Sequence, residues 1–66
     1  MFTVDQVEGS TIVTTLDNKG YHEDLEVIFD PAEVILRQWD ENWQEYNVLF
    51  LSHQQINDIK TAMENK

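Results

Sequence analysis

"VILRQWDENWQEYNVLFLSHQQ", residues 34–55, decides the fold, because its first half reads either as a helix or as a strand followed by a loop. A helix has a start signal in "DPAE", with Asp30 as N-cap, Pro31 at the first helical position and Glu33 as capping-box partner. Such a helix aligns these side chains along one stripe: Ile35, Trp39, Trp43 and Tyr46. Against it, "VIL" contains two β-branched residues, and "DEN" at 40–42 is typical of a loop. We therefore favour a strand over about residues 33–39, while a helix within 31–46 stays an alternative.

The second half of this stretch predicts a strand and then a helix. "NVLFLS" at 47–52 has apolar residues on both faces, which is typical of a central strand that is covered on each side. Ser52 and Gln55 form an S-x-x-Q capping box, which predicts a helix over about 53–64. The helix carries a narrow apolar stripe: Ile56, Ile59 and Met63. We expect that stripe to lie across one face of the sheet.

Residues 1–32 predict further strands joined by turns. Phe2 and Val4 alternate with polar neighbours, "EGS" at 8–10 is turn chemistry, and "TIVTTL" at 11–16 is rich in β-branched residues, so these runs predict a hairpin. "DNKG" at 17–20 predicts a second turn. In "DLEVIFD" one face of a half-buried strand is formed by Leu25, Val27 and Phe29. The predicted fold class is α+β: a small antiparallel β-sheet of about four to five strands with one C-terminal helix packed on one face, in a single domain over residues 1–66.

Length and composition limit how the chain can be stabilised. A domain of 66 residues buries only about 60% of the surface that its unfolded chain exposes. The chain has no cysteine, so neither a disulfide nor a Cys-based zinc site can reinforce the fold. An apolar fraction of 41% is too high for a disordered acidic tail. We expect a folded domain that depends on packing or self-association, and a homodimer is one open outcome.

The charge balance excludes several classes of partner. Thirteen Asp and Glu against four Lys and Arg give a net charge of −9, which repels phosphate backbones and anionic membrane surfaces. We therefore predict no direct nucleic-acid binding and no membrane binding. No apolar run approaches the roughly 20 residues that span a bilayer, and "MFTVDQVEG" lacks the features of a signal peptide. The expected location is the cytoplasm.

The histidines do not predict catalysis or metal binding. "YHED" places His22 beside Glu23 and Asp24, but adjacent residues on a strand point to opposite faces, so they cannot easily share an ion. His53 lies at the start of the predicted helix, where no nucleophile or substrate pocket is indicated. With only two glycines no phosphate-binding loop is predicted. We interpret the protein as non-enzymatic, with no catalytic residues, no metal and no cofactor; a metal-binding protein centred on His22 is the least favoured alternative.

The aromatic residues around "DEN" are the best candidates for contact with a partner. A domain of this size seldom hides two indoles beside a loop, and Trp, Tyr and Arg are the residues that most often anchor interfaces. The candidate partner-binding residues are Arg37, Trp39, Asp40, Glu41, Trp43, Glu45 and Tyr46. The alternative is that Trp39 and Tyr46 simply pack as a cross-strand pair. Both interpretations can hold for different residues.

The acidic composition also raises the hypothesis of a DNA mimic. Duplex DNA would present about 16 charges along a globule roughly 28 Å across. A net charge of −9 approaches that density only if the carboxylates gather on one side. In the sequence they are spread over nearly every predicted turn, which general solvation explains equally well. An acidic plug for a basic groove therefore remains a hypothesis.

Residues 33–63 resemble small uncharacterised acidic proteins of tailed bacteriophages. The shared pattern is E-V-x-L-R-Q-x-D, a loop, and an apolar strand that ends in L-S-x-Q-Q before a helix. The resemblance implies a strand, loop, strand and helix order. It also implies a phage-encoded modulator or inhibitor of a host protein, such as a nucleic-acid-handling or defence enzyme, acting in the host cytoplasm. The alternative is a structural or assembly component of a phage particle.

Overall fold

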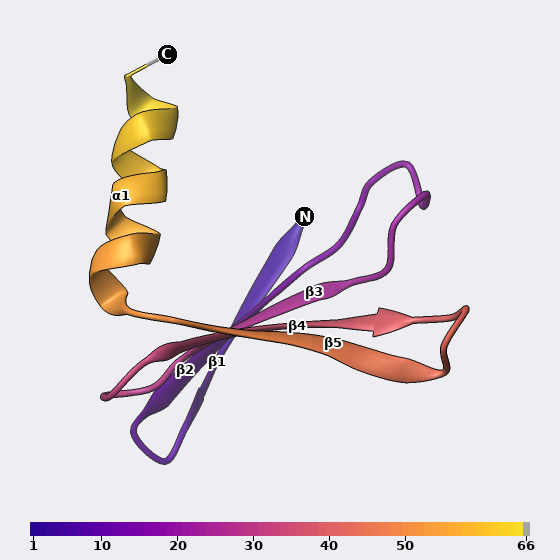
Figure 1. The fold of residues 1–66 in the computed structure, drawn as a ribbon, viewed down its shortest axis with the longest axis horizontal. Coiled ribbons are helices and arrows are strands. Elements are labelled where there is room, and N and C mark those ends of the chain that lie inside the picture. Colours follow the sequence, from indigo (N-terminus) through magenta and orange to yellow (C-terminus); the bar gives the residue numbers. More distant parts are fainter. Residues whose placement is uncertain (66) are drawn as a thin grey trace.

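The computed structural model describes residues 1–65 and consists of five strands followed by one helix (Figure 1). The elements are β1 (Phe2–Val7), β2 (Ser10–Thr15), β3 (Leu25–Phe29), β4 (Val34–Asp40), β5 (Glu45–Leu51) and α1 (His53–Glu64). The strands form one sheet in the order β1-β2-β3-β4-β5, and each adjacent pair is antiparallel. The predicted fold class, an antiparallel sheet followed by one C-terminal helix, is confirmed.

The ambiguous segment forms a strand, a turn and a strand, so the helical alternative for residues 31–46 is wrong. Asp40 stabilises the turn, because its Oδ1 accepts hydrogen bonds from the backbone N–H groups of Asn42 at 3.0 Å and Trp43 at 3.3 Å. Gln44 closes the turn with a left-handed φ of 53°. Local turn chemistry therefore overrides the helix start signal at Asp30.

The strand register divides the side chains between two faces. The first, which we call the apolar face, carries the apolar residues Phe2, Val4, Val13, Leu25, Val27, Phe29, Val34, Leu36, Leu49 and Leu51, together with Gln6, Thr11, Thr15, Gln38, Asp40, Glu45 and Asn47. The second, which we call the mixed face, carries Thr3, Asp5, Val7, Ser10, Ile12, Thr14, Glu26, Ile28, Ile35, Arg37, Trp39, Tyr46, Val48 and Phe50. Both faces therefore mix apolar and polar side chains, but the apolar face carries charge only at Asp40 and Glu45, at one end of the sheet, whereas the mixed face carries Asp5, Glu26 and Arg37 within the strands.

The core is very small. Among the described residues only Val34 is completely buried, at 0% exposure; it lies on the apolar face between its register partners Phe29 and Leu51. Most other residues of β2, β3 and β4 are half-buried, and those of β1 are exposed. A single layer of sheet leaves most of its apolar side chains without a second layer to pack against.

The position of β5 differs from the prediction of a central, covered strand. It lies at one edge of the sheet, where Val48, Leu49 and Phe50 are 42%, 61% and 64% exposed. The reason is topological: each strand pairs with the next along the chain, so the last strand has a neighbour on one side alone. Its two-sided apolar pattern is therefore uncovered within one chain.

The helix has the predicted bounds and the predicted start. Ser52 Oγ accepts the N–H of Gln55 at 3.1 Å, and Gln55 Oε1 accepts the N–H of Ser52 at 3.0 Å, which completes the capping box. At the first turn His53 Nε2 lies 2.7 Å from the carbonyl oxygen of Asp30 in the β3–β4 turn. No helix in the described part of the chain has the length and apolar character needed to cross a membrane.

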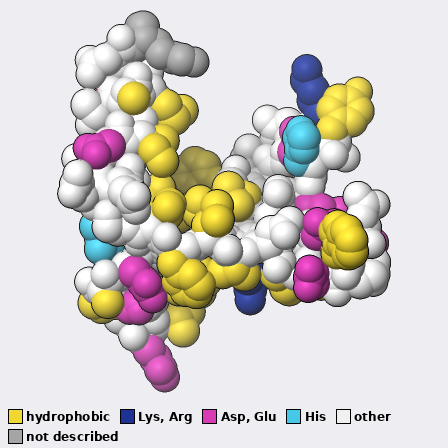
Figure 2. All heavy atoms as spheres, in the orientation of Figure 1, with side chains coloured by type: hydrophobic (Ala, Val, Ile, Leu, Met, Phe, Trp, Pro, Cys, Tyr) yellow, Lys and Arg dark blue, Asp and Glu magenta, His cyan; other side chains and the backbone are white. Residues whose placement is uncertain are grey.

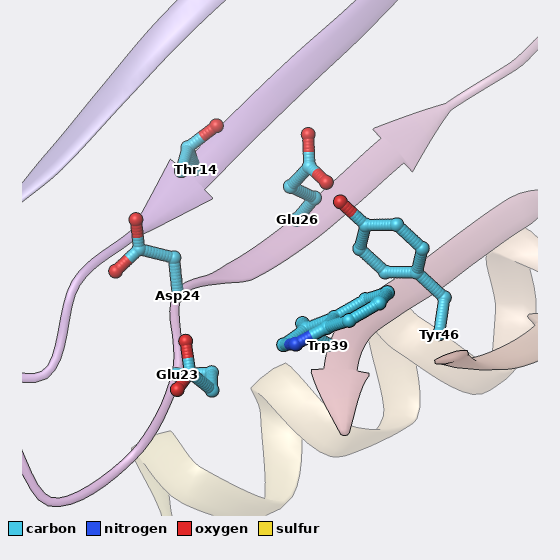
Figure 3. Close-up of a pocket in the computed structure, with 6 residues that line it drawn as sticks. All are labelled: Thr14, Glu23, Asp24, Glu26, Trp39 and Tyr46. Carbon is cyan, nitrogen blue, oxygen red and sulfur yellow. The ribbon is translucent and has the colours of Figure 1, made fainter. Parts of the chain in front are cut away.

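The helix stands over the apolar face without packing closely against it. Figure 3 looks onto the mixed face and shows α1 behind the strands, and Figure 2 shows hydrophobic side chains on both sides of the hollow between helix and sheet. Ile59 and Met63 stay 51% and 67% exposed, and none of the described helix residues is buried. The predicted placement over a face is present, but the expected close contact along the apolar stripe is not.

Candidate protein-binding site

Three of the predicted partner-binding residues lie together on the mixed face. Trp39 and Tyr46 are register partners, and their rings meet edge to face with centroids 5.1 Å apart and an interplanar angle of 73°. The guanidinium carbon of Arg37 lies 4.5 Å from the centroid of the Tyr46 ring. The cross-strand pair proposed as an alternative is therefore present, and it forms part of a larger cluster.

Arg37 is held by a carboxylate on the neighbouring strand. Glu26 is its register partner on β3, and Glu26 Oε1 accepts hydrogen bonds from Arg37 Nε at 2.9 Å and Nη2 at 2.7 Å. Two bonds from one planar guanidinium fix its orientation. Arg37 therefore neutralises Glu26 and supports the Tyr46 ring from one side.

The other four predicted residues lie in or beside the β4–β5 turn. Asp40 is used by the turn itself, and its Oδ2 also accepts a bond from Asn47 Nδ2 at 3.3 Å. Glu41 accepts hydrogen bonds from Gln44 Nε2 through its carbonyl oxygen at 2.8 Å and through Oε2 at 3.0 Å. Trp43 is 75% exposed, and Glu45 is exposed. The structure thus places Asp40 and Glu41 in turn stabilisation and leaves Trp43 and Glu45 facing solvent.

A shallow hollow of about 300 Å³ opens on the mixed face beside the Trp39–Tyr46 pair (Figure 3). It is lined by Thr14, Glu23, Asp24, Glu26, Trp39 and Tyr46. The sequence had indicated Trp39 and Tyr46 for partner binding, and it had considered Glu23 and Asp24 for metal binding and among the carboxylates of an acidic plug. Glu26 could have been found from strand alternation, which places it on the face opposite Leu25 and Val27.

The loop that carries Glu23 and Asp24 is held by backbone hydrogen bonds. Asp17 accepts the N–H of Lys19 at 3.2 Å, of Tyr21 at 3.0 Å and of His22 at 3.0 Å. Gln38 Nε2 on β4 donates to the carbonyl oxygen of Glu23 at 2.9 Å. These contacts keep Glu23 and Asp24 on the edge of the hollow that Trp39 and Tyr46 also line, although the loop has no regular secondary structure.

The hydrogen bonds to Asp17 change its titration. The N–H of Lys19 above all, then those of His22 and Tyr21, lower the pKa of Asp17 below its ordinary value against an opposing effect of desolvation. A carboxylate with a lowered pKa stabilises the folded state above its unfolded pKa of about 3.9. That stabilisation disappears as the pH falls through the lower folded value.

Asp17→Asn tests this role of the loop carboxylate. We expect a lower melting temperature than that of the unchanged protein at neutral pH, because the neutral amide has one acceptor oxygen in place of two and cannot accept all three N–H groups. The difference should shrink as the pH falls below about 4. Thermal unfolding followed by circular dichroism at several pH values measures it, with Asp5→Asn on exposed β1 as control. A difference that stays constant down to acid pH would contradict the assignment.

The hollow combines unneutralised negative charge with an aromatic wall. Within residues 1–65, neither Glu23 nor Asp24 takes part in an ion pair, whereas Glu26 is paired with Arg37. The same part of the chain holds no group of three or more His, Cys, Asp or Glu side chains placed to share a metal ion. Carboxylates beside the faces and edges of aromatic rings suit an organic cation such as a Lys or Arg side chain.

Six of the thirteen acidic residues lie at the same end of the sheet as the hollow. Because consecutive strands run in opposite directions, the β2–β3 loop and the β4–β5 turn lie at the same end of the sheet, which we call the acidic end. Figure 2 shows several carboxylates there. Its acidic residues are Asp17, Glu23, Asp24, Asp40, Glu41 and Glu45. This end therefore holds nearly half of the acidic residues, together with Lys19, and the other seven acidic residues lie elsewhere in the chain.

Fold and hollow together define a small α+β protein with a single-layer antiparallel meander and an acidic, aromatic-lined surface. Residues 3–62 match a family described as "Domain of unknown function (DUF8831)", and the chain belongs to that family. No curated protein and no solved structure matches the chain.

Proposed function

We propose that the chain is a non-enzymatic protein-binding module that receives Lys or Arg side chains of another protein in the hollow on its mixed face. The observation that carries the proposal is the position of Glu23 and Asp24, which form no ion pair within the described chain and line the same hollow as Trp39 and Tyr46. Within the chain itself, the guanidinium carbon of Arg37 lies 4.5 Å from the centroid of the Tyr46 ring, which is the kind of contact that a partner's cation would make.

The binding free energies of the expected contacts favour a basic segment over a single cation as the ligand. An exposed ion pair contributes about 0.2–1 kcal/mol, and a cation over an aromatic ring about 0.5–2 kcal/mol. One Lys in the hollow therefore gains about 1–3 kcal/mol, less than the roughly 4 kcal/mol of a millimolar complex. Useful affinity needs several basic residues spread over the acidic end. The net charge of −9 would also steer such a segment toward the protein.

The resemblance of residues 33–63 to acidic phage proteins supplies the setting of the proposal. A phage-encoded module acting in the host cytoplasm would bind a host protein with a basic groove, such as a nucleic-acid-handling or defence enzyme. By occupying that groove it would act as an inhibitor. The six carboxylates at the acidic end support this interpretation, since they give a basic segment several partners beside the hollow.

A peptide titration tests the proposal. In a Trp43→Phe variant, Trp39 is the remaining indole and reports on the hollow. An oligolysine peptide should change its emission with sub-millimolar affinity, and the affinity should fall as salt rises. An oligoglutamate peptide of the same length serves as control. An unchanged emission with oligolysine, or an equal response to both peptides, would remove the hollow as the binding site.

A further inference from the structure

The chain exposes more surface than a compact protein of its mass. Its accessible surface is 5481 Å², whereas a compact monomer of 7.8 kDa exposes roughly 4,400 Å². Its radius of gyration is 12.9 Å, against about 11 Å for a compact domain of this length. The excess of roughly 1,100 Å² is comparable to one side of a specific protein interface. The single-layer sheet and the exposed helix account for it.

The apolar face is the surface best suited to another copy of the chain. Two chains with a net charge of −9 each repel one another, so an interface between them must avoid carboxylates. Along the whole apolar face the register places charged residues only at the acidic end, where Asp40 is opposite Glu45. The mixed face instead carries Asp5, Glu26 and Arg37 within the strands.

The helix also lacks a partner along most of its length. An isolated helix of 12 residues is marginal in water, and most helical stability in proteins comes from packing of an apolar face. The capping box fixes the start of α1, but Ile59 and Met63 on its stripe remain more than half exposed. Leu49 on β5 is similarly exposed on the same side of the sheet.

We propose that a second copy of this chain covers the apolar face, with the helix of each copy lying against the sheet of the other. The arrangement is a two-fold dimer in which the same surface of both copies is buried. If each copy buries the surface that it exposes beyond a compact monomer, the interface totals roughly 2,200 Å², within the range of obligate homodimers. A depression of about 120 Å³ on the apolar face, lined in part by Leu25, Leu36 and Leu49, provides room for partner side chains.

The dimer should respond to salt in the opposite sense from the binding of a basic segment. Screening weakens the repulsion between two acidic chains, and apolar burial does not depend on charge pairs. Dimerisation therefore strengthens as salt rises, whereas attraction to oligolysine weakens. The two interactions use opposite faces and can be measured independently.

Sedimentation equilibrium of the intact chain tests the dimer. We expect twice the chain mass of 7.8 kDa, with a dissociation constant that falls as salt rises. The helical signal in circular dichroism should decrease on dilution together with the dimer fraction. A mass of one chain throughout the micromolar range, at low and high salt, would overturn the proposal.

Two adjacent residues on β5 provide a matched pair of variants. Leu49 on the apolar face and Phe50 on the mixed face are 61% and 64% exposed in a single chain. Replacing either residue therefore removes no buried side chain from the monomer. Leu49→Glu introduces one carboxylate per copy into the interface and should weaken the dimer by about 100-fold or more. Phe50→Glu should leave it dimeric. The reverse result would place the interface on the mixed face and overturn the proposal.

If the Leu49→Glu variant fails to fold, a spin-label experiment tests the proposed dimer without it. The chain has no cysteine, so Met63→Cys allows a single nitroxide label on the helix. Labelled chains are mixed with isotope-labelled chains that carry no nitroxide. Broadening of the amide signals of Leu25, Val27 and Leu36 in the second population is expected, because the partner's helix lies on that face. Broadening confined to residues of the mixed face, or none, would contradict the proposed arrangement.

Discussion

Replacement of Val34 by Asp is expected to unfold the chain at room temperature. Val34 has no exposed surface, and its register partners Phe29 and Leu51 leave it surrounded by apolar side chains on the apolar face. An unpaired carboxylate at such a position costs about 4 kcal/mol or more. The whole domain has roughly 3–10 kcal/mol of stability at typical values per residue. A sheet with a single fully buried side chain should lie at the low end of that range.

Denaturant unfolding followed by circular dichroism measures this effect. The matched control is Val48→Asp, because Val48 is also a strand valine but is 42% exposed on the mixed face. There the new carboxylate would lie opposite Arg37 and remain solvated, so a change within about 1 kcal/mol is expected. Val34→Ala gives a graded version, with a loss of about 2 kcal/mol. Folded Val34→Asp protein with native dichroism would show that the core lies elsewhere.

Local signals in the sequence located most elements of the fold, although the helix start signal in "DPAE" left residues 31–46 ambiguous. The capping box of Ser52 and Gln55 involves residues three positions apart, and it fixed the start of the helix correctly. The turn at "DEN" likewise depends on neighbouring residues, since Asp40 binds the N–H groups of Asn42 and Trp43. Interactions of this range can be recognised without knowing the rest of the structure.

The missed features depend on contacts between residues distant in the sequence. Glu23 comes close to Trp39 because β3 pairs with β4 and because Gln38 holds the carbonyl group of Glu23. No periodicity within the loop reports that proximity. The edge position of β5 was missed for a different reason. Its apolar pattern indicates that both faces need cover, but it does not say whether the same chain provides the cover.

The two proposed surfaces are compatible within one assembly. If a second copy covers the apolar face, both mixed faces point outward, and each carries one hollow with Glu23 and Asp24. Two linked sites raise the apparent affinity for a partner with repeated basic segments, because the second contact becomes intramolecular. A dimer could therefore compensate for the modest energy that a single hollow supplies.

Reversal of the charge of the hollow should abolish most of the binding to a basic peptide. In a Glu23→Lys, Asp24→Lys double variant two attractions become repulsions, a change on the order of 2–3 kcal/mol that corresponds to about 100-fold in affinity. Both side chains are exposed and form no ion pair within residues 1–65, so the fold should be retained. The bond from Gln38 goes to the backbone of Glu23 and survives the substitution.

The decisive control has the same net charge in a different place. Asp5→Lys with Glu8→Lys changes two exposed carboxylates of the β1–β2 hairpin, and each double variant carries a net charge of −5 instead of −9, since every substitution adds two units. Titration with oligolysine at low salt compares them. Because long-range steering depends on total charge, both variants should lose some affinity, but the loss should be about tenfold or more larger for the hollow variant. Equal losses would show that the peptide responds to overall charge, and that the carboxylates beside Trp39 and Tyr46 have no special part in recognition.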